Sequence, residues 1–266
     1  MSINKKNPYD VESHIAEIYD NIECNRDDVN LILQLLKEFN CKNILEPFCG
    51  TGRILLSLAE NGFDVTGIDA SHVMLNALQK KRAAQSTSIR NKVKIIVADV
   101  TEYGWAKGYD AIILGCNCLF ELATLEEQEK VLTKAYNSVK SGGYIFIDSD
   151  IIENELPDYW CKLNTENSAF PSGLCEDGIE LKSYSKPTFV DKKNKIWKAS
   201  RRTEVYKDSK IIAEYSWKQQ KHPIGYSEIM NIVANLNLSV INVWGDIIGK
   251  KPFKLGSGRA TFWLKK

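Results

Sequence analysis

The sequence predicts an α/β protein built on a doubly wound, mostly parallel sheet of seven strands, with an antiparallel β-meander inserted after the fifth strand. Two observations support this fold class. Apolar strand segments alternate with helical segments over residues 43–150 and again over residues 223–266, which is typical of a parallel sheet covered by helices on both faces. Between these parts, apolar residues recur at every second position, which is the period of half-buried antiparallel strands.

Residues 1–42 precede the first strand and contain two predicted helices, Val11–Glu23 and Asp27–Phe39, the second with apolar residues at near-helical spacing. Residues 43–150 then alternate between strand and helix. The predicted strands are Asn43–Pro47, Val65–Asp69, Val93–Ala98, Tyr109–Gly115 and Tyr144–Ser149. The predicted helices are Gly52–Asn61, Ser71–Arg82 and Leu125–Lys140.

Residues 151–222 form the predicted meander, with strands separated by the turn sequences DKKNK and KDSK. Its strands are Ser183–Val190, Lys195–Tyr206 and Lys210–Gln219, and Ile211, Ala213, Tyr215 and Trp217 alternate strictly in the last. Residues 223–266 return to the α/β pattern and complete the core. Here Ser227 is the expected N-cap of a helix over Glu228–Leu236, followed by strands Leu238–Trp244 and Ala260–Leu264.

Charge and cysteine content narrow the class of protein. A net charge of +1 over 266 residues gives no overall attraction for nucleic acid or an anionic membrane. Residues 182–221 are locally basic, with 12 Lys or Arg against 4 Asp or Glu, which fits either solvated strand faces or a groove for an anionic substrate. The seven cysteines include no C-x-x-C pair, so we expect reduced thiols, no metal site and a cytoplasmic protein. No apolar run is long enough for a signal peptide or a membrane span.

The segment Ile44–Arg53, ILEPFCGTGR, places a tight Gly50-Thr51-Gly52 turn between a strand and a helix, where backbone can approach a ligand closely. Asp69 follows Gly52 by 17 residues and ends the second strand, where a carboxylate can accept both hydroxyls of a ribose. Rossmann-like nucleotide folds in general share this spacing, so it indicates a nucleotide without identifying which one.

Two residues favour a cationic ligand over a dinucleotide. Leu55 stands where the third glycine of a dinucleotide fingerprint would be, so the close helix–strand packing of that type is not expected. Glu46 lies four residues before Gly50, where it would repel a pyrophosphate but attract an ammonium or sulfonium group. An NAD-dependent oxidoreductase is therefore disfavoured.

Five segments resemble, in order, the motifs of class I S-adenosylmethionine (SAM)-dependent methyltransferases: ILEPFCGTGR, GIDAS followed by Met74, VADV, YDAIILGCN and SGGYIFID. The resemblance implies the strand order 3-2-1-4-5-7-6, SAM as cofactor and S-adenosylhomocysteine as product. It also implies that Glu46 and the glycine turn border the methionine moiety and that Asp69 binds the ribose. One departure is Phe48, which stands in place of the family's first glycine.

The same resemblance places Ala70 and Met74 beside the adenine, Asp99 at its exocyclic amine and the backbone of Val100 near its ring. Cys116 and Asn117 close the fourth strand, at the edge where ligands bind in open α/β sheets. The expected cofactor-binding residues are Tyr19, Glu46, Phe48, Gly50, Thr51, Gly52, Arg53, Asp69, Ala70, Met74, Asp99, Val100, Cys116 and Asn117.

Methyl transfer needs positioning and the removal of a proton where the acceptor is acidic. The candidate catalytic residues are His222, Glu121 and Tyr9, with Tyr19, Tyr226 and Arg201 as further pocket candidates; each has an ordinary structural alternative. Cys116 and Cys118 are expected to be apolar fillers, because no basic neighbour is visible in the sequence. No Pro-Pro-Tyr signature follows Asn117, which removes the usual marker of adenine, cytosine or glutamine methylation.

By resemblance to small-molecule methyltransferases, residues 1–42 are expected to form a lid over the cofactor and the meander a roof over the acceptor. We therefore predict transfer of a methyl group to nitrogen or oxygen of a small molecule, by a monomer or homodimer without a membrane partner. Two alternatives stay open. One is an RNA or protein methyltransferase that uses the basic stretch 182–221, and the other is a SAM-binding regulatory or scaffold protein without turnover.

Overall fold

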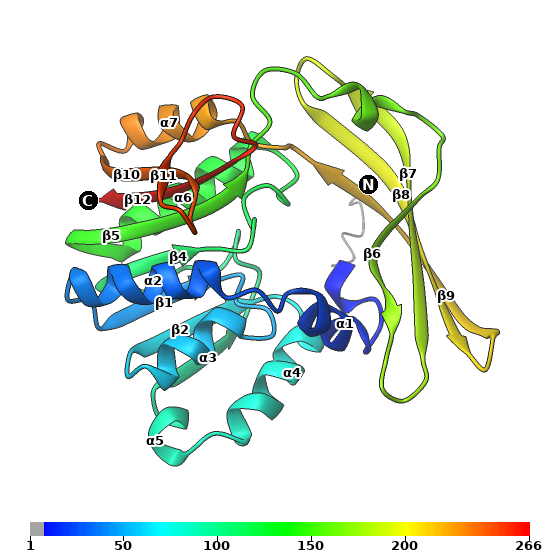
Figure 1. The fold of residues 1–266 in the computed structure, drawn as a ribbon, viewed down its shortest axis with the longest axis horizontal. Coiled ribbons are helices and arrows are strands. Elements are labelled where there is room, and N and C mark those ends of the chain that lie inside the picture. The colour runs from blue at the N-terminus through cyan, green and yellow to red at the C-terminus, as the bar shows by residue number, and fades with distance from the viewer. Residues whose placement is uncertain (1–7) are drawn as a thin grey trace.

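The computed structural model describes residues 8–266, so the first seven residues of the predicted N-terminal segment lie outside the described residues. The molecule consists of a large sheet with helices on both faces and a curved antiparallel sheet beside it (Figure 1). Residues 8–22 lie between the two sheets, at the carboxyl edge of the parallel strands (Figure 1).

The large sheet has the predicted seven-strand order, with one added edge strand, β11, next to β10. Strands β1 to β5 are parallel to one another, whereas β12 runs antiparallel to both β5 and β10. The full order is β11-β10-β12-β5-β4-β1-β2-β3. The strands are β1 (Asn43–Pro47), β2 (Asp64–Asp69), β3 (Val93–Val97), β4 (Tyr109–Leu114), β5 (Val139–Asp150), β10 (Ser239–Asp246), β11 (Lys251–Pro252) and β12 (Arg259–Lys265).

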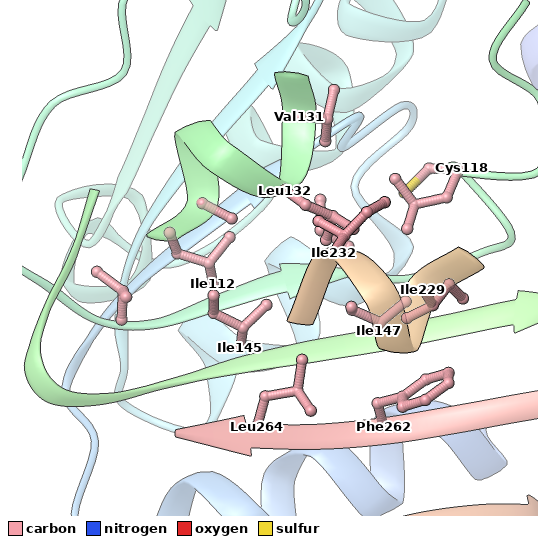
Figure 2. Packing of buried hydrophobic residues seen from close by; sticks show 14 of the residues in the cluster. Ile112, Cys118, Val131, Leu132, Ile145, Ile147, Ile229, Ile232, Phe262 and Leu264 are labelled. Carbon is pink, nitrogen blue, oxygen red and sulfur yellow. The ribbon is translucent and has the colours of Figure 1, made fainter. Parts of the chain in front are cut away.

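Successive residues of the central strands point to opposite faces, and each face has its own apolar cluster. One cluster joins Ile112 and Ile145 to helices α6 and α7 (Figure 2), and the other joins Ala111 and Phe146 to α2, α3 and α4. The helices are α2 (Asp27–Glu38), α3 (Arg53–Glu60), α4 (His72–Ala83), α5 (Thr87–Arg90), α6 (Leu125–Ser138) and α7 (Tyr226–Asn235). Both faces of the sheet are therefore covered, as predicted.

Helix α3 does pack closely on the sheet, although its sequence lacks the third glycine. The small residue is on the strand instead. A Cβ atom at Gly67 in β2 would lie 2.9 Å from Leu55 Cδ2 and 2.6 Å from Cys49 Sγ, and one at Gly115 would lie 2.8 Å from Ile54 Cδ1. Leu55 therefore packs closely on the sheet without a glycine at its own position, because Gly67 in β2 and Gly115, which follows β4, leave room for the helix.

The meander has four strands rather than three, in the order β6-β7-β8-β9. They are β6 (Asn167–Leu174), β7 (Glu180–Asp191), β8 (Ile196–Lys207) and β9 (Lys210–Lys221), preceded by the short helix η2 (Asp158–Cys161). The sequence did not reveal β6, because its NSAFPSGL contains Pro and Gly and lacks an apolar alternation. Odd-numbered residues of β8 such as Ala199 and Thr203 are buried on the inner face, while Lys198 is exposed on the outer face.

The predicted N-terminal helices are both present, although the first is shorter. Helix α1 (Ile15–Ile22) follows a short 3-10 helix, η1 (Pro8–Asp10), and packs Ile15 and Ile18 against Leu181 and Val205 of the meander. It also contacts α4 on the other side, so α1 joins the two sheets. Helix α7 begins after Gly225, whose N–H donates to Glu228 Oε2, so the expected N-cap at Ser227 is two residues too late.

Within residues 8–266, no helix is both long enough and apolar enough to cross a membrane.

Candidate cofactor and acceptor site

The turn after β1 has three residues in the left-handed region, with φ of 62° at Phe48, 52° at Gly50 and 82° at Gly52. A Cβ atom at Gly52 would lie 2.3 Å from Leu78 Cδ1, so glycine is required there for space as well as for conformation. Phe48 adopts the same conformation in place of the family's first glycine, at a cost of roughly 1–3 kcal/mol. Its half-buried side chain packs against the core cluster of the α6 and α7 face, which helps to offset that strain.

Asp69 ends β2 beside this turn, and backbone groups fix its carboxylate. The N–H of Gly50 donates to Oδ2 at 2.8 Å and the N–H of Ser71 donates to Oδ1 at 2.9 Å. Burial raises the pKa of Asp69, and these backbone donors oppose the rise. A carboxylate has about four acceptor positions, so both oxygens can still accept from a diol. The arrangement leaves room for a diol, and ribose binding by Asp69 stays a prediction.

Glu46 lies in β1 one residue before the strand ends, and its side chain is buried. Its Oε2 has no hydrogen-bond partner among the described residues. Burial raises the pKa of this carboxyl well above its usual range, while the nearby Arg53 guanidinium lowers it. A buried, unpaired carboxylate oxygen beside the glycine turn fits a ligand that carries an ammonium or sulfonium group, because such a ligand would supply the missing partner.

The side chain of Arg53 faces other protein groups. Its Nη1 and Nη2 donate to Asp28 of α2 at 2.8 and 2.5 Å, and Nη2 lies 2.8 Å from Cys116 Sγ. The expectation that Cys116 has no basic neighbour is therefore wrong. Burial nevertheless dominates and raises the pKa of Cys116 to about 11, so the thiol remains protonated and unreactive. Asp28 was not predicted from the sequence, because the pair of Arg53 and Asp28 joins two separate helices.

Thr51 connects the glycine turn to α1. Its hydroxyl donates to Asp20 Oδ1 at 2.6 Å, and Asp20 also pairs with Lys81 of α4 at 2.6 Å. The predicted cofactor residue Tyr19 precedes Asp20, and burial together with the neighbouring Cys116 raises the pKa of its hydroxyl. Helix α1 is thus fixed directly over the turn, through Asp20 and Lys81, which sequence reasoning did not identify.

The N-terminal segment also contacts the start of α4, where the adenine is expected. Ser71 Oγ lies 2.9 Å from the Tyr9 carbonyl oxygen and 3.0 Å from Asp10 Oδ1, and it accepts the N–H of Met74. Asp99, at the end of the neighbouring strand β3, is exposed and accepts the N–H of Thr101 through Oδ1. Two further residues were predicted to lie near the adenine. Ala70 precedes Ser71 and Val100 follows Asp99, so both lie at the same edge of the sheet.

Tyr9 lies between the cofactor side and the meander. Its ring centroid is 6.4 Å from that of Tyr19 and 5.6 Å from that of Phe170 in β6. Burial raises the pKa of Tyr9, and the charges of Glu121 and Asp69 raise it further. The phenol therefore stays protonated, so it can orient a group by hydrogen bonding but does not serve as a base near neutral pH.

Glu121 follows β4 and is close enough to affect both Tyr9 and Arg201 of β8 electrostatically. Lys221, the last residue of β9, donates to the Glu121 carboxylate at 2.6 Å. The structure thus brings together Tyr9, Glu121 and Arg201 from three segments that are distant in sequence.

Three other predicted residues face elsewhere. His222 Nε2 lies 3.2 Å from Glu228 Oε1, and both residues line a cavity of about 670 Å³ beside the N-termini of α6 and α7. Tyr226 stacks on Phe253 with ring centroids 4.4 Å apart, inside the core. Asn117 joins β4 to β5, because its Nδ2 donates to Asp150 Oδ2 at 2.9 Å and its Oδ1 accepts the N–H of Asp150. The structure therefore does not group these side chains with Tyr9 and Glu121.

Comparison with known proteins agrees with this geometry. A family model described as "Methyltransferase domain" matches residues 39–222. Glycine N-methyltransferase of Oryctolagus cuniculus is 29% identical over 161 residues, which cover 55% of this chain and 53% of that protein. The chain spans about half the length of the first curated relatives that it matches.

Two solved structures have the same fold. A SAM-dependent methyltransferase from Clostridium acetobutylicum aligns with a TM-score of 0.70 and 16% identity, over 94% of this chain and 96% of the other. SAM-bound CalS10, an amino pentose methyltransferase from Micromonospora echinaspora, aligns with a TM-score of 0.65 and 15% identity, over 98% and 99%. With the family model matching well over half of its length, this chain belongs to the class I SAM-dependent methyltransferases, whose cofactor is SAM and whose coproduct is S-adenosylhomocysteine.

Proposed function

We propose that this protein transfers the methyl group of SAM to the nitrogen of a small-molecule amine. The observation that carries the proposal is the cluster of Tyr9, Glu121 and Arg201, in which Tyr9 is also near the predicted cofactor residue Asp69 and Arg201 belongs to the meander. In this proposal the N-terminal segment serves as the lid and the meander as the roof of the acceptor site. The printed names of two similar proteins, a glycine N-methyltransferase and an amino pentose methyltransferase, support an amine as acceptor.

Bound SAM supplies an electrophilic methyl group on a sulfonium that is already a good leaving group. The residues of this chain then have three tasks. Glu46 offers its unpaired carboxylate oxygen to the cationic end of the cofactor, and Asp69 accepts the ribose hydroxyls. The protonated Tyr9 excludes water and donates a hydrogen bond at the boundary between cofactor and acceptor.

In this proposal, Glu121 accepts the proton of the acceptor amine. An amine is largely protonated near neutral pH but must be neutral to attack the methyl group. The carboxylate of Glu121 attracts the ammonium form and accepts its proton, while Lys221 keeps the carboxylate oriented at 2.6 Å. A neutral amine is already nucleophilic, whereas an alcohol would need a strong base to form an alkoxide, and this favours nitrogen over oxygen as the acceptor atom.

The basic stretch 182–221 gives little support to an RNA or protein acceptor. Its exposed lysines, such as Lys186, Lys198 and Lys218, alternate with the buried residues and so lie on the outer face of the meander. Arg202 on that face is paired with Glu204 and Glu166. The outer cations therefore face away from the cluster of Tyr9, Glu121 and Arg201.

The test is formation of S-adenosylhomocysteine from SAM with a panel of small amines, measured for the wild type and for Glu121→Gln. We expect kcat to fall about a hundredfold in the variant, because a general base is removed, with the Kd for SAM unchanged. Glu129→Gln, at an exposed position of α6, is the matched control and should retain full activity. Full activity of Glu121→Gln would contradict the assigned role, and no turnover of any amine by the wild type would contradict the proposed function.

A further inference from the structure

One row of residues crosses the inner face of the meander from strand to strand. Ser185 in β7 lies opposite Arg201 in β8, and Arg201 lies opposite Trp217 in β9. Arg201 and Trp217 are more than nine-tenths buried, with 8% and 7% of their surface exposed. The Arg201 Cζ is 5.7 Å from the centroid of the Trp217 ring. We call these three residues the donor row.

Each member of the donor row has a buried polar atom without a hydrogen-bond partner among the described residues. The atoms are Ser185 Oγ, Arg201 Nε and Trp217 Nε1. All three carry a hydrogen that can be donated, and two of them can only donate. In the adjacent row the hydroxyl groups do have hydrogen-bond partners, because Ser183 Oγ and Thr203 Oγ1 are 2.6 Å apart. Three unmet donors at directly neighbouring positions indicate a missing acceptor rather than a general packing defect.

Within the described part of the chain, Arg201 also lacks a direct ion-pair partner, although Glu121 is near enough to interact with its charge. Arg201 Nη1 donates to Gln219 Oε1 and Nη2 donates to the Phe170 carbonyl at 2.5 Å, so its bonded partners are neutral. Among residues 8–266, no carboxylate forms an ion pair with Arg201, and Glu121 is paired with Lys221 instead. Burial of a guanidinium costs free energy when it has no direct ion-pair partner, and the carboxylate of a ligand would supply that partner.

The surroundings show that the donor row is a polar gap in an apolar face. On one side, Leu181 and Val205 pack against α1, and on the other, Trp197 and Ala199 pack against Leu156. Ser185 also lines a cavity of about 370 Å³ whose other walls include Trp160, Trp197 and Lys221. A ligand in this cavity would contact Ser185 of the donor row and Lys221, which pairs with Glu121.

We propose that the donor row binds the carboxylate of an amino-carboxylate acceptor and directs its amine toward Tyr9 and Glu121. This assignment rests on the proposed amine methylation. One positive charge without a direct ion pair and two neutral donors match a singly charged carboxylate better than a doubly charged phosphate. Phe170 fixes the direction, because its carbonyl accepts from Arg201 while its ring contacts that of Tyr9.

The test compares amino carboxylates with the amines that lack the carboxylate. The pairs are glycine and methylamine, alanine and ethylamine, and phenylalanine and phenethylamine. Binding is measured by calorimetry and by ligand-detected NMR with S-adenosylhomocysteine present, and turnover is measured with SAM. We expect the wild type to bind at least one amino carboxylate about tenfold or more tightly than its partner amine.

Two mild substitutions remove single donors, Ser185→Ala the hydroxyl and Trp217→Phe the indole N–H. Each should weaken binding of the amino carboxylate about tenfold and leave the Kd for S-adenosylhomocysteine unchanged. Trp263→Phe is the matched control, because Trp263 Nε1 is also buried without a partner but lies in the core of the large sheet. It should change neither affinity. Arg201→Met, which removes the charge, should abolish the preference for the carboxylate.

The outcomes separate the two proposals. If amino carboxylates bind and Ser185→Ala and Trp217→Phe weaken that binding, but no methyl transfer occurs, the donor row stands and the proposed function fails. If amines are methylated equally well with and without a carboxylate, the function stands and the donor row is overturned. Wild-type affinity in both Ser185→Ala and Trp217→Phe would also overturn it.

Discussion

The carboxyl edge of the large sheet and the inner face of the meander both present buried polar side chains to the N-terminal segment between them, but they hold those side chains differently. At the carboxyl edge, backbone N–H groups fix the carboxylate of Asp69. On the meander, Ser185, Arg201 and Trp217 each have a donor without a partner. Backbone donors come with the turn conformation itself, so the cofactor side is preformed by local sequence. The acceptor side is assembled from several strands, and we propose that its unpaired donors bind a ligand.

The largest expected effect tests the preformed side. Asp69→Ala removes the carboxylate that Gly50 and Ser71 orient, and it should weaken SAM binding more than tenfold, which is about 1.4 kcal/mol or more. Calorimetric titration with SAM measures the change. Asp64→Ala is the control, since Asp64 is an exposed residue at the other end of the same strand and pairs with Lys92. Unchanged affinity in Asp69→Ala would remove Asp69 from the cofactor site.

The next effect concerns the junction between the two sheets, where Glu228 of α7 meets Lys195 of the meander at 2.5 Å. Burial alone would raise the pKa of Glu228, but hydrogen bonds from His222, Lys195 and the Gly225 N–H lower it to about 2. A folded-state pKa below the unfolded value stabilises the protein above the unfolded pKa, and that contribution is lost as pH falls through the folded pKa. Glu228→Gln should therefore cost roughly 1 kcal/mol at pH 7, because solvent screens the interactions of this partly exposed side chain.

Urea denaturation of both proteins at several pH values checks this expectation. The difference in unfolding free energy should be constant above about pH 5 and should shrink between pH 4.5 and about pH 2, because the wild-type carboxylate becomes protonated there. A difference that stays constant down to pH 2 would show that the carboxylate charge does not anchor the meander to the core.

The smallest effect is expected at Phe48. The backbone of Phe48 already has the left-handed conformation that the family's glycine would adopt, with φ of 62°. Phe48→Gly should therefore leave the Kd for SAM within about threefold, since relief of strain and loss of packing act on stability rather than on the ligand. Titration with SAM and thermal unfolding measure the two quantities separately. A tenfold change in the Kd would mean that the Phe48 side chain itself contacts the cofactor.

The sequence by itself determined the parts of the protein in which neighbours in the chain are neighbours in space. The alternation of strands and helices predicted a parallel sheet covered on both faces, and the resemblance of its motifs implied the order of the seven strands. The glycine turn and Asp69 were expected at one edge, because a parallel sheet brings the ends of adjacent strands together. The sequence did not reveal β6, which lacks alternation, or the room that Gly67 leaves for Leu55.

Only the tertiary structure decided the acceptor side. Alternation predicted that Trp217 points inward, but not that it lies opposite Arg201 and that Ser185 completes the row, because cross-strand register depends on turns and bulges. From the sequence, His222, Glu121 and Tyr9 were equal candidates for a catalytic role. In the folded protein, His222 pairs with Glu228, and Tyr9 and Glu121 come together. Side-chain contacts between different elements of the fold carry no local sequence signal, so their chemistry appears only once the chain has folded.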